Sequence, residues 1–318
     1  MKNDVVIITG GNKGLGLECA KEIVRSKGGT EVLIACRDLQ KGLESKTNLL
    51  NINELQKVAV RQLDLAEYSS ISEFIDWFEQ TYSSYRLSGV ICNAGVQYLD
   101  KTVTTNDSYE KTFAVNHLGH FQLVTNLLDR IVSDRSRIII VSSGTHDPKR
   151  VEGRSNPAKY FMDGGLARVS TSKSLNGMQR YTSSKLCNLL FTYQLDRVIN
   201  THGKTTATVN AYDPGGVPQT GLLKTEGSFT AKLVKAFFST SFTRYVMNYF
   251  GIMISTPEKS GKAMARLFLD EELIGVSGGY FQLDKMVNSS EDSYNMAYAN
   301  DLWESSLKII DKRRQSIS

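Results

Sequence analysis

The sequence of 318 residues contains little cysteine, proline or tryptophan, with four, five and two residues of these types. The four cysteines, Cys19, Cys36, Cys92 and Cys187, lie far apart and form no CxxC pair. This spacing disfavours a disulfide framework or a structural metal site, so we expect no metal and a reducing, cytoplasmic compartment. With 41% hydrophobic residues, the composition is typical of a folded core rather than of a disordered chain.

Long hydrophobic runs are also absent. No run approaches the roughly 18 apolar residues of a membrane span. The chain passes from Met1 almost directly into Val5–Thr9 and a glycine turn, so we expect no signal peptide. Lysine and arginine exceed aspartate and glutamate by only 38 to 33, and they form no dense basic stripe. This mild charge suits an anionic cofactor and does not predict a nucleic-acid partner.

Short β-branched runs alternate with longer helical stretches. The expected strands are continuously apolar, as in sheets covered on both faces, and comprise Val5–Thr9, Glu31–Ala35, Val58–Leu63, Ser88–Cys92, Arg137–Val141, Thr206–Ala211 and Gly279–Leu283. The expected helices are Gly14–Ser26, Leu39–Leu50, Ser69–Tyr82, Tyr109–Val132, Gln179–Ile199 and Glu258–Leu269. Repeated strand–helix units predict a single doubly wound α/β (Rossmann) domain over residues 1–318, with a seven-stranded, mostly parallel sheet.

Three segments break this rhythm. Gly144–Met178 is polar and rich in glycine, serine, lysine and arginine, and Val287–Ser318 forms a C-terminal extension. Gly227–Thr256 carries aromatic residues at helical spacing, flanked by basic residues. This aromatic segment has three interpretations: core packing, a helical lid over a bulky apolar substrate, or a helix in peripheral contact with a membrane. We use the substrate lid as the working prediction.

The first expected strand ends in a glycine-rich turn, Thr9-Gly10-Gly11-Asn12-Lys13-Gly14-Leu15-Gly16. A turn of this kind between a strand and a helix lets the backbone approach a pyrophosphate, which binds at the helix N-terminus. Glycines are common in turns, but their position here favours a cofactor site. The predicted cofactor-binding residues of this turn are Gly10, Asn12, Lys13, Gly14, Leu15 and Gly16.

The second expected strand indicates which nicotinamide cofactor is bound. A carboxylate at this strand end usually binds the ribose 2′-hydroxyl of NAD, whereas an arginine accommodates the 2′-phosphate of NADP. Arg37 comes first here, and Lys13 can reach the same phosphate. Asp38 is better placed to cap the next helix. The two cations therefore predict NADP(H).

Two further strand ends extend the predicted cofactor site. Asp64 and Leu65 follow the third strand, where they can border the adenine. Asn93, Ala94 and Gly95 follow the fourth, where a glycine permits close approach of the backbone to the cofactor.

Taken together, the motifs TGxxxGxG, DL, NAG, a helical Asn, a Ser and YxxxK resemble the short-chain dehydrogenase/reductase superfamily from Asp4 to Phe281. Four segments are similar to protochlorophyllide reductases and retinol-dehydrogenase-like enzymes: Ala35–Asp38, Val115–Phe121, Ser184–Asn188 and Pro214–Leu222. The stretch between Ser143 and Tyr181 departs from the light-driven pigment reductases, so photochemical reduction is not expected.

The resemblance implies a catalytic set of Asn116, Ser143, Tyr181 and Lys185. In this set Tyr181 is the proton donor, Ser143 rather than Ser142 binds the reacting oxygen, and Asn116 holds a water that relays protons through Lys185. Tyr181 and Lys185 would also contact the cofactor. The resemblance adds four residues of a loop beside the nicotinamide, namely Pro214, Gly215, Val217 and Thr220.

Physical chemistry supports the tyrosine–lysine pair. Tyr181 and Lys185 are four residues apart, so a helix presents both on one face. A phenol has a pKa of about 10, and a nearby lysine cation is expected to lower the pKa of Tyr181. Tyr181 can then protonate a carbonyl oxygen, or deprotonate an alcohol in the reverse direction.

Three other residues could carry chemistry. His117 and His120 are three apart, but no third metal ligand is evident, so we interpret them as packed helix histidines. Cys187 matches the pigment-reductase pattern and could be a second proton donor. Because it follows Lys185 by two residues and faces away from it, a small buried hydrophobic role is favoured.

These features predict an NADPH-dependent oxidoreductase that reduces a carbonyl group of a bulky apolar small molecule and is reversible as an alcohol dehydrogenase. The alternative within enzymes is reduction of a conjugated C=C bond, and the alternative of another class is a non-catalytic NADP-binding sensor. The resemblance implies dimers or tetramers through Tyr109–Val132 and Gln179–Ile199, whereas the C-terminal extension favours a monomer. Homodimer and monomer both remain open.

Overall fold

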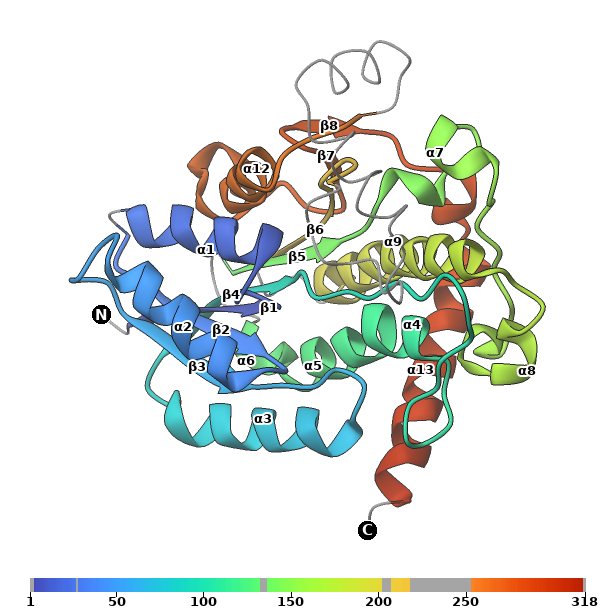
Figure 1. Ribbon diagram of the computed structural model, residues 1–318, viewed down its shortest axis with the longest axis horizontal. Coiled ribbons are helices and arrows are strands. Elements are labelled where there is room, and N and C mark those ends of the chain that lie inside the picture. The colour runs from blue at the N-terminus through green and yellow to red at the C-terminus, as the bar shows by residue number, and fades with distance from the viewer. Residues whose placement is uncertain (1–2, 27, 132–135, 202–206, 218–252, 317–318) are drawn as a thin grey trace.

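The computed structural model describes residues 3–26, 28–131, 136–201, 207–217 and 253–316. Its strands form one eight-stranded sheet in the order β3-β2-β1-β4-β5-β6-β7-β8 (Figure 1). The strands are β1 Asp4–Thr9, β2 Glu31–Cys36, β3 Val58–Gln62, β4 Arg86–Cys92, β5 Arg137–Val141, β6 Thr208–Asp213, β7 Tyr280–Gln282 and β8 Lys285–Val287. All pairings are parallel except β7–β8. The α/β doubly wound fold is confirmed.

Helices cover both faces of the sheet. The longer helices are α1 Gly14–Arg25, α2 Leu39–Leu50, α3 Tyr68–Thr81, α5 Gly119–Asn126, α9 Gly177–Thr201, α12 Pro257–Leu269 and α13 Met296–Gln315. The short segments are α4 Lys111–Phe113, α6 Leu128–Ile131, α7 Val151–Arg154, α8 Val169–Ser172, the π-helical η1 Ala114–Leu118, and the 3-10 turns η2 Gly144–His146, η3 Gly165–Ala167, η4 Glu271–Leu273 and η5 Glu291–Tyr294.

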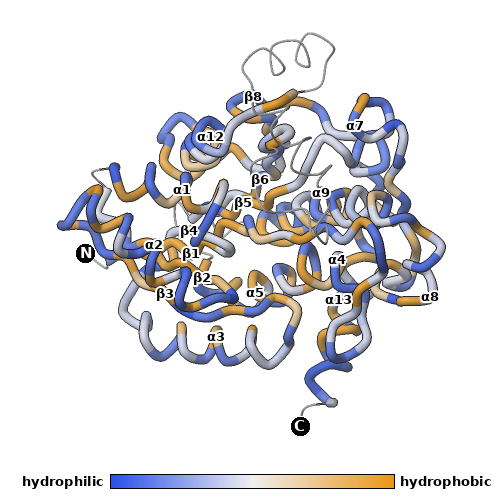
Figure 2. Tube along the Cα trace, in the orientation of Figure 1, coloured by the Kyte–Doolittle hydropathy of each residue, from blue (hydrophilic) through white to orange (hydrophobic). Residues whose placement is uncertain are grey.

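The apolar strands separate two cores. In β1, Val5 and Ile7 belong to the core that also contains residues of α3, α5 and α9, whereas Val6 and Ile8 belong to the core beneath α1 and α12. Strand side chains alternate between the two faces of a sheet, so a continuous apolar run fills both cores. Figure 2 shows this hydrophobic centre within more hydrophilic outer segments.

The sheet has eight strands rather than the predicted seven. The additional strand, β8, forms a hairpin with β7 through Leu283, whose φ is 54°. It comprises three residues, two of them exposed, so it lacks the apolar run that identified the other strands.

The helix predicted over Tyr109–Val132 is interrupted. The Glu110 side chain accepts hydrogen bonds from the backbone of Thr112 (3.0 Å) and Phe113 (2.7 Å), so helical structure begins only at Lys111. The segment η1 is π-helical and includes Asn116. Such wide turns are common at functional sites. Sequence periodicity does not reveal this one, because all five residues of η1 are buried and no polar face marks the wide turn.

The C-terminal extension contains a long helix, α13, that periodicity did not predict. Its buried positions include Ser305, Ser306 and Arg313 instead of a regular apolar stripe. Helix α13 packs against α9, and Ser306 Oγ lies 3.0 Å from His117 Nε2. Arg313 pairs with Asp107 and donates to the carbonyl of Ala66 at 2.8 Å. Buried polar contacts therefore attach this helix.

The predicted lid falls mainly outside the described residues. Its last part is described: Gly216 donates a backbone hydrogen bond to Met253 at 2.7 Å, and Ser255 donates one to Gly216 at 2.9 Å. Across the ranges given above, no helix is both long and apolar enough to cross a membrane.

Buried histidines should make the fold sensitive to acid. Burial lowers the pKa of His117 to about 3 and of His120 to about 4, against 6.5 ordinarily. The unfolded chain therefore binds protons first, and stability is lost as pH falls through 6.5 towards these values. Between about pH 7.5 and pH 5 each histidine should cost about 2 kcal/mol of unfolding free energy.

The check is urea unfolding of the wild type and of His117→Gln at both pH values. Glutamine does not take up a proton, so the variant should lose about 2 kcal/mol less on acidification, whatever its absolute stability. An equal loss in both proteins would contradict the prediction.

Candidate active site

A cavity of about 360 Å³ lies at the carboxyl ends of the central strands. The strand order reverses between β1 and β4, which is where open α/β sheets bind ligands. Most of the predicted site residues line it: Gly10, Asn12, Lys13, Gly14, Leu15, Arg37, Asp64, Leu65, Asn93, Ala94, Gly95, Ser143, Tyr181, Lys185, Pro214, Gly215 and Val217. The topology therefore brings together side chains spread over most of the chain.

The glycine turn has the conformation that its sequence requires. Gly10 and Gly14 have φ values of 63° and 55°, a region that favours glycine. Gly16 does not line the cavity; a Cβ there would lie 2.5 Å from Asn93 Nδ2 and 2.6 Å from the Gly10 carbonyl oxygen. Gly16 thus allows α1 to pack on the turn. No side chain caps the N-terminus of α1 at Lys13, which suits an anionic group there.

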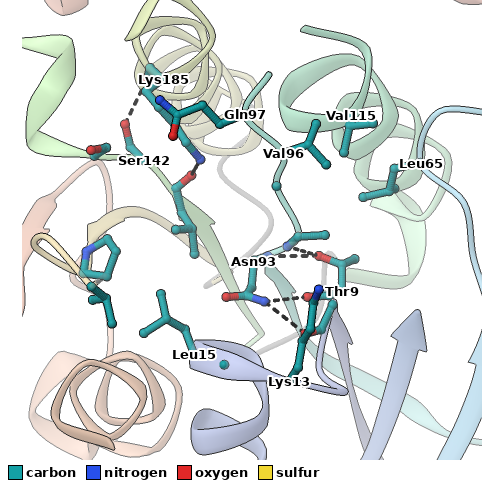
Figure 3. Close-up of a pocket in the computed structure, with 18 of the residues that line it drawn as sticks. Thr9, Lys13, Leu15, Leu65, Asn93, Val96, Gln97, Val115, Ser142 and Lys185 are labelled. Carbon is teal, nitrogen blue, oxygen red and sulfur yellow. Dashed lines mark hydrogen bonds between the residues drawn. The ribbon is translucent and has the colours of Figure 1, made fainter. Parts of the chain in front are cut away.

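Hydrogen bonds of the Thr9 side chain connect the glycine turn to the loop after β4 and to His120 on α5. Thr9 Oγ1 accepts hydrogen bonds from the backbone of Asn93 (2.9 Å) and Ala94 (3.0 Å) (Figure 3). It also lies 2.9 Å from His120 Nε2. His120 Nδ1 lies 3.2 Å from the carbonyl of Asn116, which only accepts, so Nδ1 carries the proton and Nε2 is an acceptor. The Thr9 hydroxyl therefore has two acceptors within reach, His120 Nε2 at 2.9 Å and the Ile91 carbonyl at 3.3 Å. The sequence shows no signal for the contact of Thr9 with His120, because the two residues are far apart in the chain.

The outer end of the cavity is positively charged. Arg37 and Lys13 both border it and are exposed. Asp38 caps α2 as predicted: its carboxylate accepts from the Lys41 backbone at 3.1 Å and pairs with Lys41 Nζ at 2.7 Å. The carboxylate of Asp38, which follows β2, is therefore hydrogen-bonded to the first turn of α2.

Tyr181, Ser143 and Lys185 meet at the inner end. Tyr181 and Ser143 both line this end, and Lys185 Nζ lies 5.5 Å from the centre of the Tyr181 ring. Ser142 instead donates to the Lys185 backbone carbonyl at 2.8 Å (Figure 3). Both serines line the cavity, and the hydroxyl of Ser142 is engaged by the backbone of α9.

The pKa of Tyr181 differs from the prediction. Burial raises the pKa of Tyr181 above its ordinary value, and the neighbouring Ser143 hydroxyl opposes this only in part. The Lys185 ammonium lies 5.5 Å from the centre of the Tyr181 ring and donates to the Val141 carbonyl at 3.0 Å. Burial lowers the pKa of Lys185 itself to about 8.

Asn116 lies behind the cavity and not in its wall. Its side-chain oxygen accepts from the Val96 backbone at 2.8 Å, and its nitrogen donates to the Val96 carbonyl (3.1 Å) and to Ser184 Oγ (3.0 Å). Asn116 therefore ties η1 to the loop after β4 and to α9, one residue before Lys185.

The structure resolves the roles of the other candidates. His117 and His120 are buried and hydrogen-bonded, which confirms that they are packed helix residues. Cys187 is buried in the core that includes α13, where burial and then Asp301 raise its pKa. Cys187 does not line the cavity.

The nicotinamide-side loop and its surroundings are described as far as Val217. Gly215 has a φ of 71°, and its backbone donates to Asp213 Oδ1 at 2.9 Å. Thr220 lies outside the described residues. Gln97 and Met178 also line the cavity, with Gln97 Nε2 2.8 Å from Met178 Sδ, and sequence reasoning missed both.

A glycine turn at the switch point of a doubly wound sheet, facing a Tyr–Lys pair, is typical of Rossmann-fold oxidoreductases. The profile of the family described as short chain dehydrogenase matches residues 4–154. Retinol dehydrogenase 11 from Homo sapiens is 32% identical over 307 residues, covering 96% of this chain and 85% of that protein. Protochlorophyllide reductase A from Oryza sativa subsp. japonica is 30% identical over 332 residues, covering 98% and 81%.

The chain therefore belongs to the short-chain dehydrogenase family, and it is an oxidoreductase. This confirms the family resemblance seen in its motifs. Among solved structures, the Pseudomonas aeruginosa RhlG/NADP active-site complex superimposes with a TM-score of 0.61 at 15% identity, over 89% of this chain and 96% of that one. That likeness shows the shared fold.

We expect the Thr9 hydroxyl to hold the cofactor crevice together. Thr9→Val removes the acceptor of two backbone N–H groups, and such a loss costs about 1–3 kcal/mol per buried group. Stability in urea should fall by at least this much, and NADPH binding, measured by fluorescence titration, should weaken. The matched control is Thr192→Val: that buried hydroxyl only donates to the Asn188 carbonyl within α9. Equal effects of both substitutions would contradict the assigned role.

Proposed function

We propose that this protein is an NADPH-dependent reductase of a carbonyl group on a bulky apolar small molecule, reversible as an alcohol dehydrogenase. The observation that carries the proposal is that the buried Tyr181 shares the wall of one cavity with Ser143 and Lys185, and that the glycine turn borders the same cavity. The proposed proton donor Tyr181, the proposed oxygen-binding hydroxyl of Ser143 and the proposed cofactor crevice thus belong to the same cavity.

The preference for NADP(H) is supported by charge at the outer end of the cavity. Arg37 and Lys13 are positioned to pair with a 2′-phosphate, and the Asp38 carboxylate is held by Lys41. The cradle at Gly10, Gly14 and Gly16, which a Cβ would obstruct or strain, fits a pyrophosphate approaching the N-terminus of α1. Phosphate binding there would use backbone N–H groups.

Bound NADPH would supply the hydride. Ser143 and Tyr181 would bind the substrate oxygen, and Tyr181 would donate the proton that the oxygen requires. The raised pKa of Tyr181 keeps the phenol protonated at neutral pH, as a donor in the reductive direction must be. Lys185 would bind the nicotinamide ribose and return a proton to Tyr181 after each reduction, and Asn116 would hold the segment around it in place.

An apolar substrate is supported by the inner wall, which is lined by Val96, Val115, Val141, Met178 and Val217. Retinol dehydrogenase 11, which shares 32% identity, acts by its name on retinol, a long apolar alcohol. Gln97 adds a polar contact at this end.

The alternative is reduction of a conjugated C=C bond, which the likeness to protochlorophyllide reductase A supports. A second proton donor would be needed at the substrate, and Cys187 lies in the core away from the cavity. A non-catalytic NADP-binding sensor would leave Ser143, Tyr181 and Lys185 without a purpose. The carbonyl reductase accounts for all three.

The proposed location is cytoplasmic, because the four separated cysteines suit a reducing compartment, and cell fractionation would test it.

Between monomer and homodimer, the structure supports the monomer, because α13 packs over α9, the helix through which the family likeness implies a dimer contact. Sedimentation equilibrium distinguishes these two states.

We predict that Arg37→Ala weakens NADPH binding about ten- to hundredfold and leaves NADH binding nearly unchanged. A charge-assisted contact contributes about 1.5–3 kcal/mol, and only NADPH carries the 2′-phosphate that would make it. Titration calorimetry with both cofactors is the measurement. Losses of equal size for NADPH and NADH would refute the phosphate contact.

Tyr181→Phe keeps the aromatic ring and removes the proton donor. We predict normal folding and NADPH affinity, with kcat reduced about 10²–10⁴-fold, as expected for loss of general acid catalysis. NADPH oxidation is followed in darkness with ketones, aldehydes and enones. A variant that turns over within a factor of about three of the wild type would rule out this mechanism and favour C=C reduction.

A further inference from the structure

His146, the last residue of η2, is 1% exposed and hydrogen-bonded through both nitrogens of its ring. Nδ1 lies 2.6 Å from the Ser143 carbonyl oxygen, which only accepts, so Nδ1 carries the proton. Nε2 accepts a hydrogen bond from the backbone of Ser290 at 3.1 Å. Both contacts require the same neutral tautomer, and burial lowers the pKa of His146, which favours the neutral ring. The ring also packs edge-on against Tyr280 of β7, with ring centres 5.3 Å apart.

The turn that contains His146 also fixes the side chain of Ser143. The Ser143 carbonyl accepts from the His146 backbone at 3.2 Å as well as from the ring, so two donors set its direction. The Ser143 hydroxyl oxygen accepts from Thr145, from the backbone at 3.4 Å and from the side chain at 3.1 Å. The hydroxyl hydrogen of Ser143 can then be donated to a substrate oxygen in the cavity. Because one short turn makes all of these contacts, a ring that holds the carbonyl also holds the hydroxyl.

The other partner of His146 belongs to the C-terminal extension. Ser290 directly precedes η5, and η5 packs on α9. The hydroxyl of Tyr193, on α9, lies 2.6 Å from Ser289 Oγ, and its ring stacks on that of Tyr294 with centres 5.1 Å apart. The segment that donates to His146 is therefore attached to the helix that carries the proposed proton donor.

We propose that His146 is a positioning residue: its neutral imidazole bridges the Ser143 carbonyl and the Ser290 backbone, and so holds the Ser143 hydroxyl at a fixed place relative to Tyr181 on α9. The inference deepens the proposed function and rests on it for the consequence in turnover. A donor to the reacting oxygen must lie within hydrogen-bonding distance in the transition state, and small displacements of such a donor are costly. The C-terminal extension would thereby support the site, although none of its described residues lines the cavity.

Two variants separate the two nitrogens of the ring. In His146→Asn the side-chain amide can occupy the place of Nδ1, so the variant keeps a donor for the Ser143 carbonyl and loses the contact with Ser290. In His146→Gln the amide can reach the place of Nε2, so the variant keeps an acceptor for Ser290 and loses the donor for Ser143. Both variants remove the ring contact with Tyr280, so a role in packing alone predicts equal effects.

The first measurement needs neither cofactor nor substrate. Amide hydrogen exchange, followed by NMR, reports the two backbone N–H groups that donate to Ser143, those of Thr145 and of residue 146. Both should exchange about tenfold faster in His146→Gln than in the wild type, and within about threefold of the wild type in His146→Asn. Equal exchange in the two variants overturns the proposal.

The consequence for turnover is measured with NADPH and the ketone that the wild type reduces fastest. We expect kcat of His146→Gln to be about tenfold below the wild type at unchanged NADPH affinity, because Ser143 would act on the reacting oxygen. His146→Asn should retain most of the kcat that His146→Gln loses. Equal kcat values in the two variants overturn the positioning role. A wild type that reduces no carbonyl contradicts the proposed function instead, and hydrogen exchange then still decides the bridge.

A measurement on the wild type covers failure of either variant to fold. Long-range proton–nitrogen NMR correlations distinguish the tautomers of an imidazole, and resonance assignment identifies His146 among the four histidines of the chain. Near neutral pH, His146 should carry its proton on Nδ1 alone. A proton on Nε2, or a doubly protonated ring, overturns the proposal.

Discussion

The buried ammonium of Lys185 is the constraint on which the rest of the site depends. Only 3% of this residue is exposed, and a charge taken so far out of water is costly unless it is hydrogen-bonded or paired. The carbonyl at the end of β5 accepts one of its N–H groups. Helix α9 must therefore cross this strand end at one register, and that register places Tyr181 one turn earlier, at the cavity.

Hydrogen bonds between buried polar groups connect α9 to the other elements of the site. Asn188 also donates to the Val141 carbonyl, at 2.9 Å, and so reinforces the contact between α9 and β5. Asn116 joins α9 to the loop after β4, and His120 joins the next turn of α5 to Thr9 at the end of β1. In a low-dielectric interior such bonds are strong when made and costly when broken. The cofactor half and the substrate half of the cavity are thus connected by hydrogen bonds and not by apolar packing alone.

The two ends of the cavity differ in solvent and charge. At the outer end Lys13 and Arg37 are exposed, so their attraction for an anion acts through a screened, water-rich environment. At the inner end Tyr181 and Lys185 are buried, and the protein sets their protonation. In the proposed function, cofactor selectivity would therefore depend on screened charges, and proton transfer on buried groups of the same cavity.

The sequence by itself determined the parts of this protein that depend on local pattern. The core strands, the glycine turn, the capping role of Asp38 and the spacing of Tyr181 and Lys185 follow from periodicity and from the conformations that a few residue types prefer. These features involve neighbours in the chain, and the order of the motifs was enough to place them along one sheet edge.

Only the tertiary structure decided the features that depend on partners far apart in the chain. The contact of Thr9 with His120, the contact of His146 with Ser290, and the attachment of α13 through Ser306 and Arg313 each join residues with no shared local pattern. The pKa of Tyr181 belongs here too, because burial outweighs the effect expected from its neighbour in the helix. Burial and the dielectric environment come from the whole fold, and a spacing of four residues does not contain them.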